Sequence, residues 1–205
     1  MKLLSLIILL FLHTLLAFND GPIPEKVMKK AERKYGGLIV SRYLDYNKML
    51  RQAEHLNLHN KLTLVNEFFN NINYQSDTKN WKQDDYWATP LEFLARNKGD
   101  SEDYVIAKYF ALKTLKVDPK KLYLTYVNSK EFKRPHMVLS YFKTPEADPL
   151  ILDNINPEVL SASQRNDLTP VYNFNINTLK SLSKSDQSTH KKWEKLIKRV
   201  KRNKL

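Results

Sequence analysis

Gly99-Asp100-Ser101-Glu102-Asp103-Tyr104 opens the stretch that decides the fold, because a long apolar helix pattern follows it as far as Lys116. The apolar residues fall on one helix face: Tyr104, Ala107, Ala111, Leu112 and Leu115. Ser101 stands where an N-cap is expected, and Glu102 and Asp103 in the first turn complement the helix dipole. The pattern therefore predicts a core helix that packs through one apolar face and has a serine, a possible nucleophile, at its N-terminus.

Helix patterns precede this stretch and strand patterns follow it. Helices are expected over 25–35, 38–55 and 58–72, with a short one that opens at Thr89 or Pro90; the aperiodic residues 73–90 predict a loop. After the core helix, strands are expected over 122–127, 136–142, 150–152 and 171–174. Helices first and an antiparallel sheet second predict an α+β fold.

The composition limits the chemistry that the chain can perform. Its 205 residues favour a single domain, and 42% hydrophobic residues are enough for a core. The absence of cysteine excludes disulfides, zinc–thiolate sites and a thiol nucleophile. With only four glycines, the chain has no Gly-rich phosphate loop.

The two ends differ from the rest. Residues 1–17 have the short positive start and apolar run of a secretory signal, and a retained membrane anchor is the alternative. The domain is expected over 18–180, and export predicts a periplasmic location. Residues 180–205 carry +8 of the net charge of +12, so the basic tail over 181–205 is expected to be solvated by default, with one short amphipathic helix that contains Trp193, Leu196, Ile197 and Val200. Contact with anionic lipid or polysaccharide stays open, whereas an exported protein is not expected to bind nucleic acid.

Three residues have the layout of a nucleophile, a base and an orienting carboxylate. Ser101 heads the core helix, His136 begins a strand, and Asp153 ends the strand expected to pair with it. An antiparallel connection over 143–149 can bring Asp153 beside His136, where a carboxylate fixes the imidazole tautomer. Each residue also has a plain alternative as a helix cap, a strand residue or a turn former.

Several motifs, in order, resemble the bacterial transglutaminase-like cysteine proteinases of the LapG type. They span roughly residues 40–175 and comprise Val65–Asn70, Asp85–Leu94, Gly99–Tyr104, Ala107–Tyr109, His136–Leu139, Leu152–Asn154 and Ser163–Tyr172. The resemblance implies a papain/transglutaminase-like fold, in which the nucleophile heads a helix packed on an antiparallel sheet. It also implies calcium binding, for which Asp100, Glu102 and Asp103 match the family's acidic cluster.

The resemblance places Ser101 at the family's catalytic cysteine, His136 at its general base and Asp153 at the orienting carboxylate. The implied substrate is a large surface adhesin, and the implied regulator is an inner-membrane receptor. Serine cannot supply the thiolate on which the family's chemistry depends. The sequence therefore predicts a periplasmic peptidase homologue of reduced or no activity, with two alternatives: a non-catalytic protein that binds a peptide or receptor, and an active serine variant.

Overall fold

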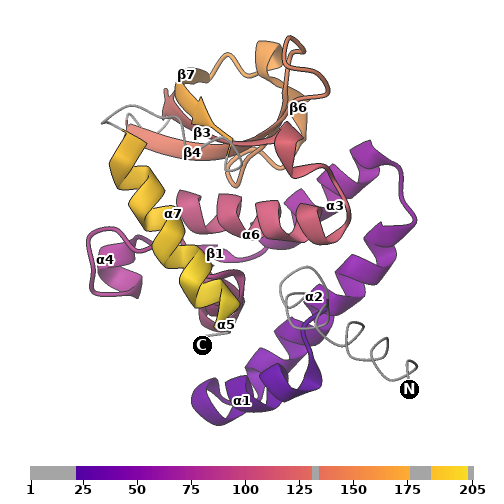
Figure 1. The fold of residues 1–205 in the computed structure, drawn as a ribbon, viewed down its shortest axis with the longest axis vertical. Coiled ribbons are helices and arrows are strands. Elements are labelled where there is room, and N and C mark those ends of the chain that lie inside the picture. Colours follow the sequence, from indigo (N-terminus) through magenta and orange to yellow (C-terminus); the bar gives the residue numbers. More distant parts are fainter. Residues whose placement is uncertain (1–21, 131–133, 176–185, 203–205) are drawn as a thin grey trace, which may run out of the picture.

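A computed structural model describes residues 22–130, 134–175 and 186–202, which form an α+β fold as predicted (Figure 1). The helices are α1 Glu25–Tyr35, α2 Leu38–Glu54, α3 Leu58–Asn70, α4 Asp77–Asn80, α5 Pro90–Arg96, α6 Ser101–Thr114 and α7 Asp186–Lys201, with 3-10 turns η2 Pro119–Lys121 and η3 Ala162–Gln164. The strands are β1 Asn73–Tyr74, β2 Lys98–Gly99, β3 Leu122–Ser129, β4 Arg134–Tyr141, β5 Leu150–Leu152, β6 Leu160–Ser161 and β7 Leu168–Phe174.

Helix α6 is the centre of the fold. Ser101 and every residue from Asp103 to Leu112 are buried, so α6 is enclosed on all sides rather than amphipathic. It packs against α3, α5 and β4. In Figure 1 the curved sheet covers one side of α6, and the earlier helices occupy its other sides. The predicted core helix is therefore confirmed, two residues shorter at its C-terminal end.

The sheet is antiparallel, with strand order β6-β5-β4-β3-β7. Strand β4 lies at its centre and pairs His136 with Val127 of β3. On its other side β4 pairs Leu139 with Leu152 of β5, so the strand containing His136 runs beside the one that ends near Asp153. The register thus places the two candidate residues on neighbouring strands.

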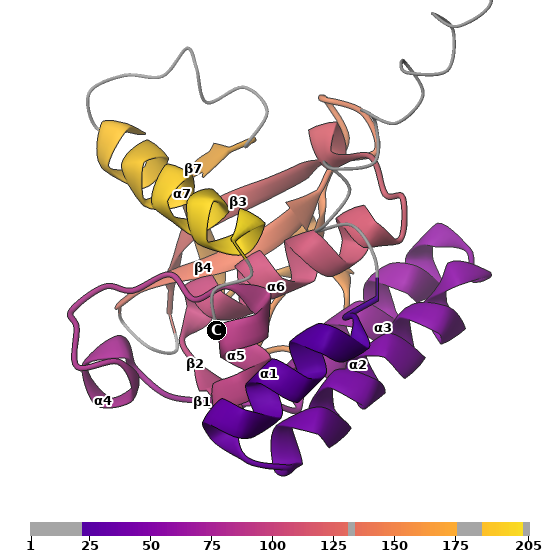
Figure 2. The ribbon, with the colours of Figure 1, turned by 60° about the horizontal axis from the view of Figure 1, so that its bottom comes forward.

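The N-terminal helices α1, α2 and α3 pack in sequence against one another (Figure 2). Gly36 ends α1 in a conformation with φ 87°, which favours glycine. The predicted helix bounds agree with the observed ones to within two residues. Residues 1–17, which carry the predicted signal, lie outside the described residues. Within the described ranges, no helix combines the length and apolar character needed to cross a membrane.

Two predicted features differ from the structure. Residues 73–90, expected as a loop, contain α4 and the strand β1, which pairs in parallel with β2. Two-residue strands such as β1, β2 and β6 are too short to show a hydrophobic period. Strand β7 also begins three residues earlier than expected, at Leu168, since Pro170 is tolerated on this edge strand.

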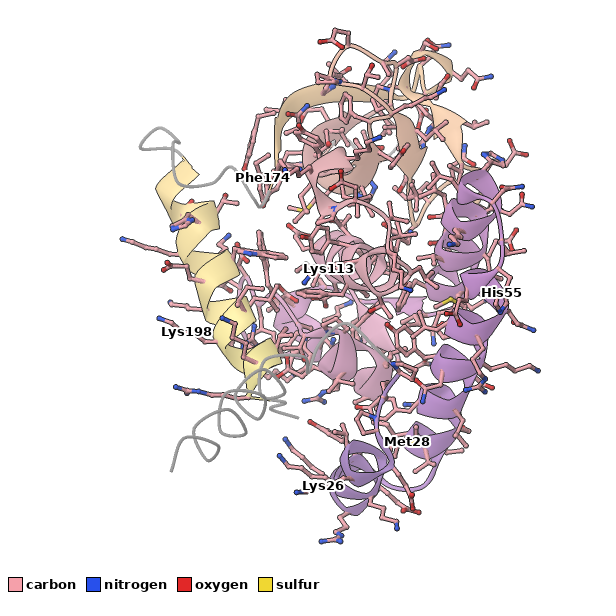
Figure 3. All side chains as sticks on the ribbon, turned by 45° about the vertical axis from the view of Figure 1, so that its right-hand side comes forward. Lys26, Met28, His55, Lys113, Phe174 and Lys198 are labelled. Atoms are coloured by element: carbon pink, nitrogen blue, oxygen red, sulfur yellow. The ribbon has the colours of Figure 1, made fainter. Side chains whose placement is uncertain are left out.

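The C-terminal tail contains the predicted amphipathic helix, but the prediction that the tail is solvated is wrong for residues 186–201. They form α7, whose apolar stripe of Trp193, Leu196 and Val200 is buried. The Trp193 ring stacks on the Phe110 ring of α6 with 5.8 Å between centroids, and it meets the Tyr109 ring edge-on with 5.6 Å between centroids. Figure 3 shows α7 (Lys198) and α2 (His55) on opposite sides of α6 (Lys113). The net charge of the tail favoured a solvated segment because the helix is rich in lysine and arginine, although its apolar stripe packs on α6.

Replacing Trp193 with alanine is expected to lower the free energy of unfolding by about 3–5 kcal/mol, because it removes a buried aromatic side chain. Chemical denaturation followed by circular dichroism measures the loss. Lys195→Ala on the exposed face of the same helix is the matched control, with a change within about 0.5 kcal/mol. Equal stability of the two variants would show that α7 does not contribute to the core.

Candidate active site

The N-terminus of α6 presents Ser101 as the first helical residue, with Asp100 rather than Ser101 at the N-cap position. The Ser101 hydroxyl donates a hydrogen bond of 2.7 Å to the carboxylate of Glu102. The free amides of the first turn give this end of the helix a partial positive charge. A negative charge that develops on the side chain at position 101 would be stabilised there.

His136 and Asp153 form a buried pair on the sheet. His136 Nε2 and Asp153 Oδ1 are 2.7 Å apart, and Asp153 is only 1% exposed. Strand β4, which carries His136, packs directly on α6, which begins with Ser101. The structure therefore brings the predicted base and orienter together, with the base on the strand that packs against the predicted nucleophile helix.

Asp153 keeps its negative charge despite its burial. Burial alone would raise the pKa of this carboxyl, but hydrogen bonds from His136 and Arg165 outweigh it and lower the pKa to about 2. Arg165 Nη2 donates to Asp153 Oδ2 at 2.7 Å, and the Ile155 amide donates to Oδ1 at 3.1 Å. Sequence reasoning placed Arg165 in a motif but gave it no role.

A second cluster of carboxylates lies beside the head of α6. Asp77, Asp100 and Asp103 each offer an oxygen, and these atoms all lie within 4.8 Å of one another. The Asp77 Oδ2 atom accepts the Tyr86 amide at 2.5 Å, and Asp103 Oδ1 accepts the Ala88 amide at 2.7 Å. Among the described residues, Asp77 Oδ1, Asp100 Oδ1 and Asp103 Oδ2 are buried without a hydrogen-bond partner.

These three carboxyls resist carrying their charges together. Burial, with a smaller effect of the Glu102 and Asp85 charges, raises the pKa of Asp77 to about 6. Burial and the neighbouring carboxylates raise the pKa of Asp100 to about 10, and burial raises the pKa of Asp103 well above its ordinary value. A divalent cation would supply the missing positive charge, and hard carboxylate oxygens are the ligands that calcium prefers. The residues present therefore fit a calcium ion.

The cluster differs in part from the predicted ligand set. Asp100 and Asp103 belong to it as expected, whereas Glu102 contacts Ser101 and is not among the three converging residues. Asp77, which the sequence placed in an aperiodic loop, takes part instead. Gly99 is needed close by, since a Cβ there would lie 2.6 Å from both the Phe93 ring and Asp103 Oδ2.

Lys108 is a buried cation that sequence reasoning did not single out. It is 0% exposed, and its ammonium group donates to Asn66 Oδ1 at 2.7 Å and Asn70 Oδ1 at 2.8 Å. The Asn70 side chain in turn donates to the backbone carbonyl of Asp153 at 2.8 Å. Burial lowers the pKa of Lys108 to about 7, opposed by the charge of Asp153. A polar network thus connects the middle of α6 to the carboxylate end of the candidate site.

Helix α7 holds the loop that frames the acidic cluster. Lys192 forms an ion pair with Asp85, and Arg199 donates to the backbone carbonyl of Trp87. Arg199 also contacts Glu92 at 3.1 Å, next to the capping box that Glu92 forms with Thr89 at the start of α5. The loop between α4 and α5 is therefore held from α7 on one side and by acidic side chains on the other.

Comparisons with known proteins agree with this geometry. The sequence profile of the bacterial transglutaminase-like cysteine proteinases (BTLCP) matches residues 45–198. A solved structure of Legionella pneumophila LapG is 38% identical, with 88% of this chain and 99% of that one covered and a TM-score of 0.72. The EGTA-treated form of the same protein is 37% identical, with 88% of this chain and 100% of that one covered and a TM-score of 0.73. The calcium-bound form is 38% identical, with 86% of this chain and 98% of that one covered and a TM-score of 0.71. No curated protein matches the chain in sequence.

The buried amine of Lys108 predicts a stability that rises with pH. Its folded pKa of about 7 lies below the unfolded value of 10.5, so between these values the unfolded chain binds more protons. The contribution of Lys108 to the free energy of unfolding is expected to increase by roughly 2 kcal/mol from pH 7 to pH 9, whereas the raised pKa of Asp100 acts in the opposite sense over this range, so the test compares the wild type with a variant that lacks the amine. Urea denaturation at both pH values measures it.

Lys108→Met is expected to flatten this rise, because it removes the titrating amine. Lys116→Met, at an exposed position just beyond α6, is the control and should keep the wild-type dependence. An equal change in stability between pH 7 and pH 9 in the wild type and in Lys108→Met would contradict the prediction.

Proposed function

Because the chain belongs to the bacterial transglutaminase-like cysteine proteinase family, we propose that it is a LapG-type peptidase homologue whose activity is reduced or lost at the nucleophile. In this proposal Ser101 occupies the nucleophile position, His136 is the general base, and Asp153 orients the imidazole. The single observation that carries it is the buried His136–Asp153 pair, on a sheet packed against a helix that begins with serine in a chain without cysteine.

The family's chemistry explains why this serine matters. A cysteine thiol with a pKa of about 8.5 becomes a thiolate beside a histidine at a helix N-terminus. A serine hydroxyl is far less acidic, so it attacks only if the base removes its proton during attack. His136 would take that proton and then return it to the leaving amine, and water would hydrolyse the resulting ester. A site shaped for sulfur places the shorter C–O bond poorly for both steps.

The hydrogen bond of Ser101 supports reduced activity. Its hydroxyl donates its proton to the Glu102 carboxylate, so this hydrogen bond must break before His136 can take the proton. Two alternatives remain. In a serine variant that works, the hydroxyl would turn to His136 when substrate binds. In a binding protein without catalysis, the same site would hold a peptide or a regulatory receptor and release it uncut.

The acidic cluster is proposed as a calcium site, formed by Asp77, Asp100 and Asp103 with Glu102 beside them. Three unpartnered buried oxygens support this assignment, as does the calcium-bound form of the related LapG. The ion would supply the positive charge that the cluster lacks. Asp77 and Asp103 already fix the amides of Tyr86 and Ala88, so they join the loop before α5 to the head of α6.

The proposed location is the periplasm, and the proposed substrate or ligand is a large surface adhesin. The apolar run at 3–12 supports export, and family membership supports the substrate class. An inner-membrane receptor is the proposed regulatory partner, and nucleic acid is not expected to bind. These assignments follow from the sequence and the family, and the cleavage experiment below addresses the substrate.

The wild-type protein is expected to cleave the N-terminal region of a surface adhesin more slowly than its Ser101→Cys variant, by about 100-fold or more, since only the variant supplies a thiolate. Gel electrophoresis of the purified mature chain with recombinant adhesin measures both rates. Adding His136→Ala to the cysteine variant should abolish the restored cleavage, because the base acts in attack and in leaving-group protonation.

The other outcomes separate the alternatives. Efficient cleavage by the unmodified chain that is lost in Ser101→Ala would contradict reduced activity and establish a serine peptidase. If Ser101→Cys stays inactive, the site has changed beyond its nucleophile, and a binding role replaces catalysis.

Calcium at millimolar concentration is expected to raise the melting temperature, and EGTA to reverse the rise, because the ion binds the folded state alone. Saturation at 100 times the dissociation constant corresponds to about 2.7 kcal/mol. Asp100→Asn should abolish the response and raise the melting temperature in EGTA, since the buried Asp100 carboxyl must take up a proton when the protein folds without calcium and the amide need not. Asp45→Asn on the exposed face of α2 is the control and should respond as the wild type does. A wild-type melting temperature insensitive to calcium would exclude the site.

A further inference from the structure

Arg165 lies on the opposite side of Asp153 from His136. The two oxygens of the Asp153 carboxylate are divided between them: Oδ1 faces His136 Nε2 at 2.7 Å, and Oδ2 accepts from Arg165 Nη2 at 2.7 Å. The guanidinium is almost as buried as the carboxylate, with Arg165 3% exposed. A carboxylate held at both oxygens in this way cannot rotate about its terminal bond without breaking a charge-assisted hydrogen bond.

Arg165 is fixed in turn by a second carboxylate. Its Nε donates to Asp167 Oδ1 at 2.9 Å and its Nη2 to Asp167 Oδ2 at 2.7 Å, a two-point contact. The Asp167 backbone carbonyl accepts the Lys130 amide at 2.9 Å, which ties this turn to the end of β3. The arginine therefore bridges a buried carboxylate and a partly exposed one, and the sheet anchors the bridge.

We propose that Arg165 is the positioning residue of the site, which holds the Asp153 carboxylate against His136 through a guanidinium fork anchored on Asp167. This inference rests on the proposed role of His136 as the base. It goes beyond the three residues of the proposed site, because Arg165 touches neither the nucleophile helix nor a reacting atom in the described contacts.

Charge and geometry both require a group of this kind. Asp153 is buried, and an isolated buried carboxylate would lose its charge or its orientation. Lys108 lies farther away and acts through Asn70, whose side chain bonds the backbone carbonyl of Asp153 and leaves the carboxylate free to turn. Only the guanidinium reaches Oδ2 among the described residues, so the orientation of the carboxylate depends on it.

A lysine could not replace this arginine. The planar guanidinium offers several N–H groups in a fixed fork, and here it uses two of its nitrogens on two carboxylates. A lysine ammonium is a single point donor on a flexible stem, and would contact Asp153 or Asp167 without holding both in a fixed plane. The conservative exchange is therefore expected to keep the charge and lose the geometry.

The first test is independent of catalysis. In the nitrogen–proton NMR spectrum of the full chain, the ring Nε2–H of His136 is expected to give a downfield, slowly exchanging signal, because it bonds a buried carboxylate. Arg165→Met and Arg165→Lys should both lose this signal, while Arg51→Met on the exposed side of α2 should retain it. Circular dichroism and melting temperature establish that each variant is folded, and Asp167→Asn gives a milder change if Arg165→Met does not fold.

The second test uses the Ser101→Cys background. Arg165→Lys is expected to lower kcat by about tenfold or more and to change KM less than twofold, as is typical of residues that orient a catalytic group. A folded Arg165→Lys variant with an unchanged His136 signal and unchanged kcat would overturn the proposal. If His136→Ala keeps full activity in the same background, the proposed function fails instead, and the NMR signal still decides whether Arg165 positions Asp153.

Discussion

Helix α6 is enclosed on all sides, and the rest of the structure depends on how its buried polar groups are satisfied. A helix in the core must bury its N-terminal amides, its acidic first turn and the amine of Lys108 without water. Two of these groups are met by other elements: the Ala88 amide, in the loop before α5, reaches Asp103, and two asparagines of α3 reach Lys108. The packing of several elements around α6 is therefore specified by hydrogen bonds as well as by apolar contact.

Two charged clusters in the described part of the chain solve the same electrostatic problem differently. Around Asp153 the protein contains its own cation, Arg165, and the carboxyl stays ionised. Around Asp100 no side chain supplies a positive charge to the three converging oxygens, and their pKa values rise. The first cluster is thus complete as folded, whereas the second is suited to a cation from solution. A change in cation concentration is therefore expected to affect the cluster around Asp100 and not the one around Asp153.

The sequence predicted the helices, the main strands and the His136–Asp153 pairing, because long periodic segments and a short antiparallel connection are local signals. It did not predict Asp77 in the acidic cluster, since that residue lies in an aperiodic segment far upstream of Asp100. Arg165 was recognised only as part of a motif, because its contact with Asp153 depends on the path of the chain after β5. The apolar stripe of α7 was predicted, but a solvated tail was preferred to a docked one, because the cations of this helix outnumber the apolar residues that pack on α6.

The late position of α7 in the chain has a consequence for synthesis. Its side chains contact Trp87, Glu92 and Phe110, which leave the ribosome roughly a hundred residues earlier. Until α7 is made, the aromatic surface of α6 is exposed, and the loop beside the acidic cluster lacks its support from Arg199. A chain that terminates before Trp193 would leave that hydrophobic surface exposed, and exposed hydrophobic surface is what chaperones and proteases recognise. Docking of α7 thus covers a hydrophobic surface that a chain truncated before this helix leaves exposed.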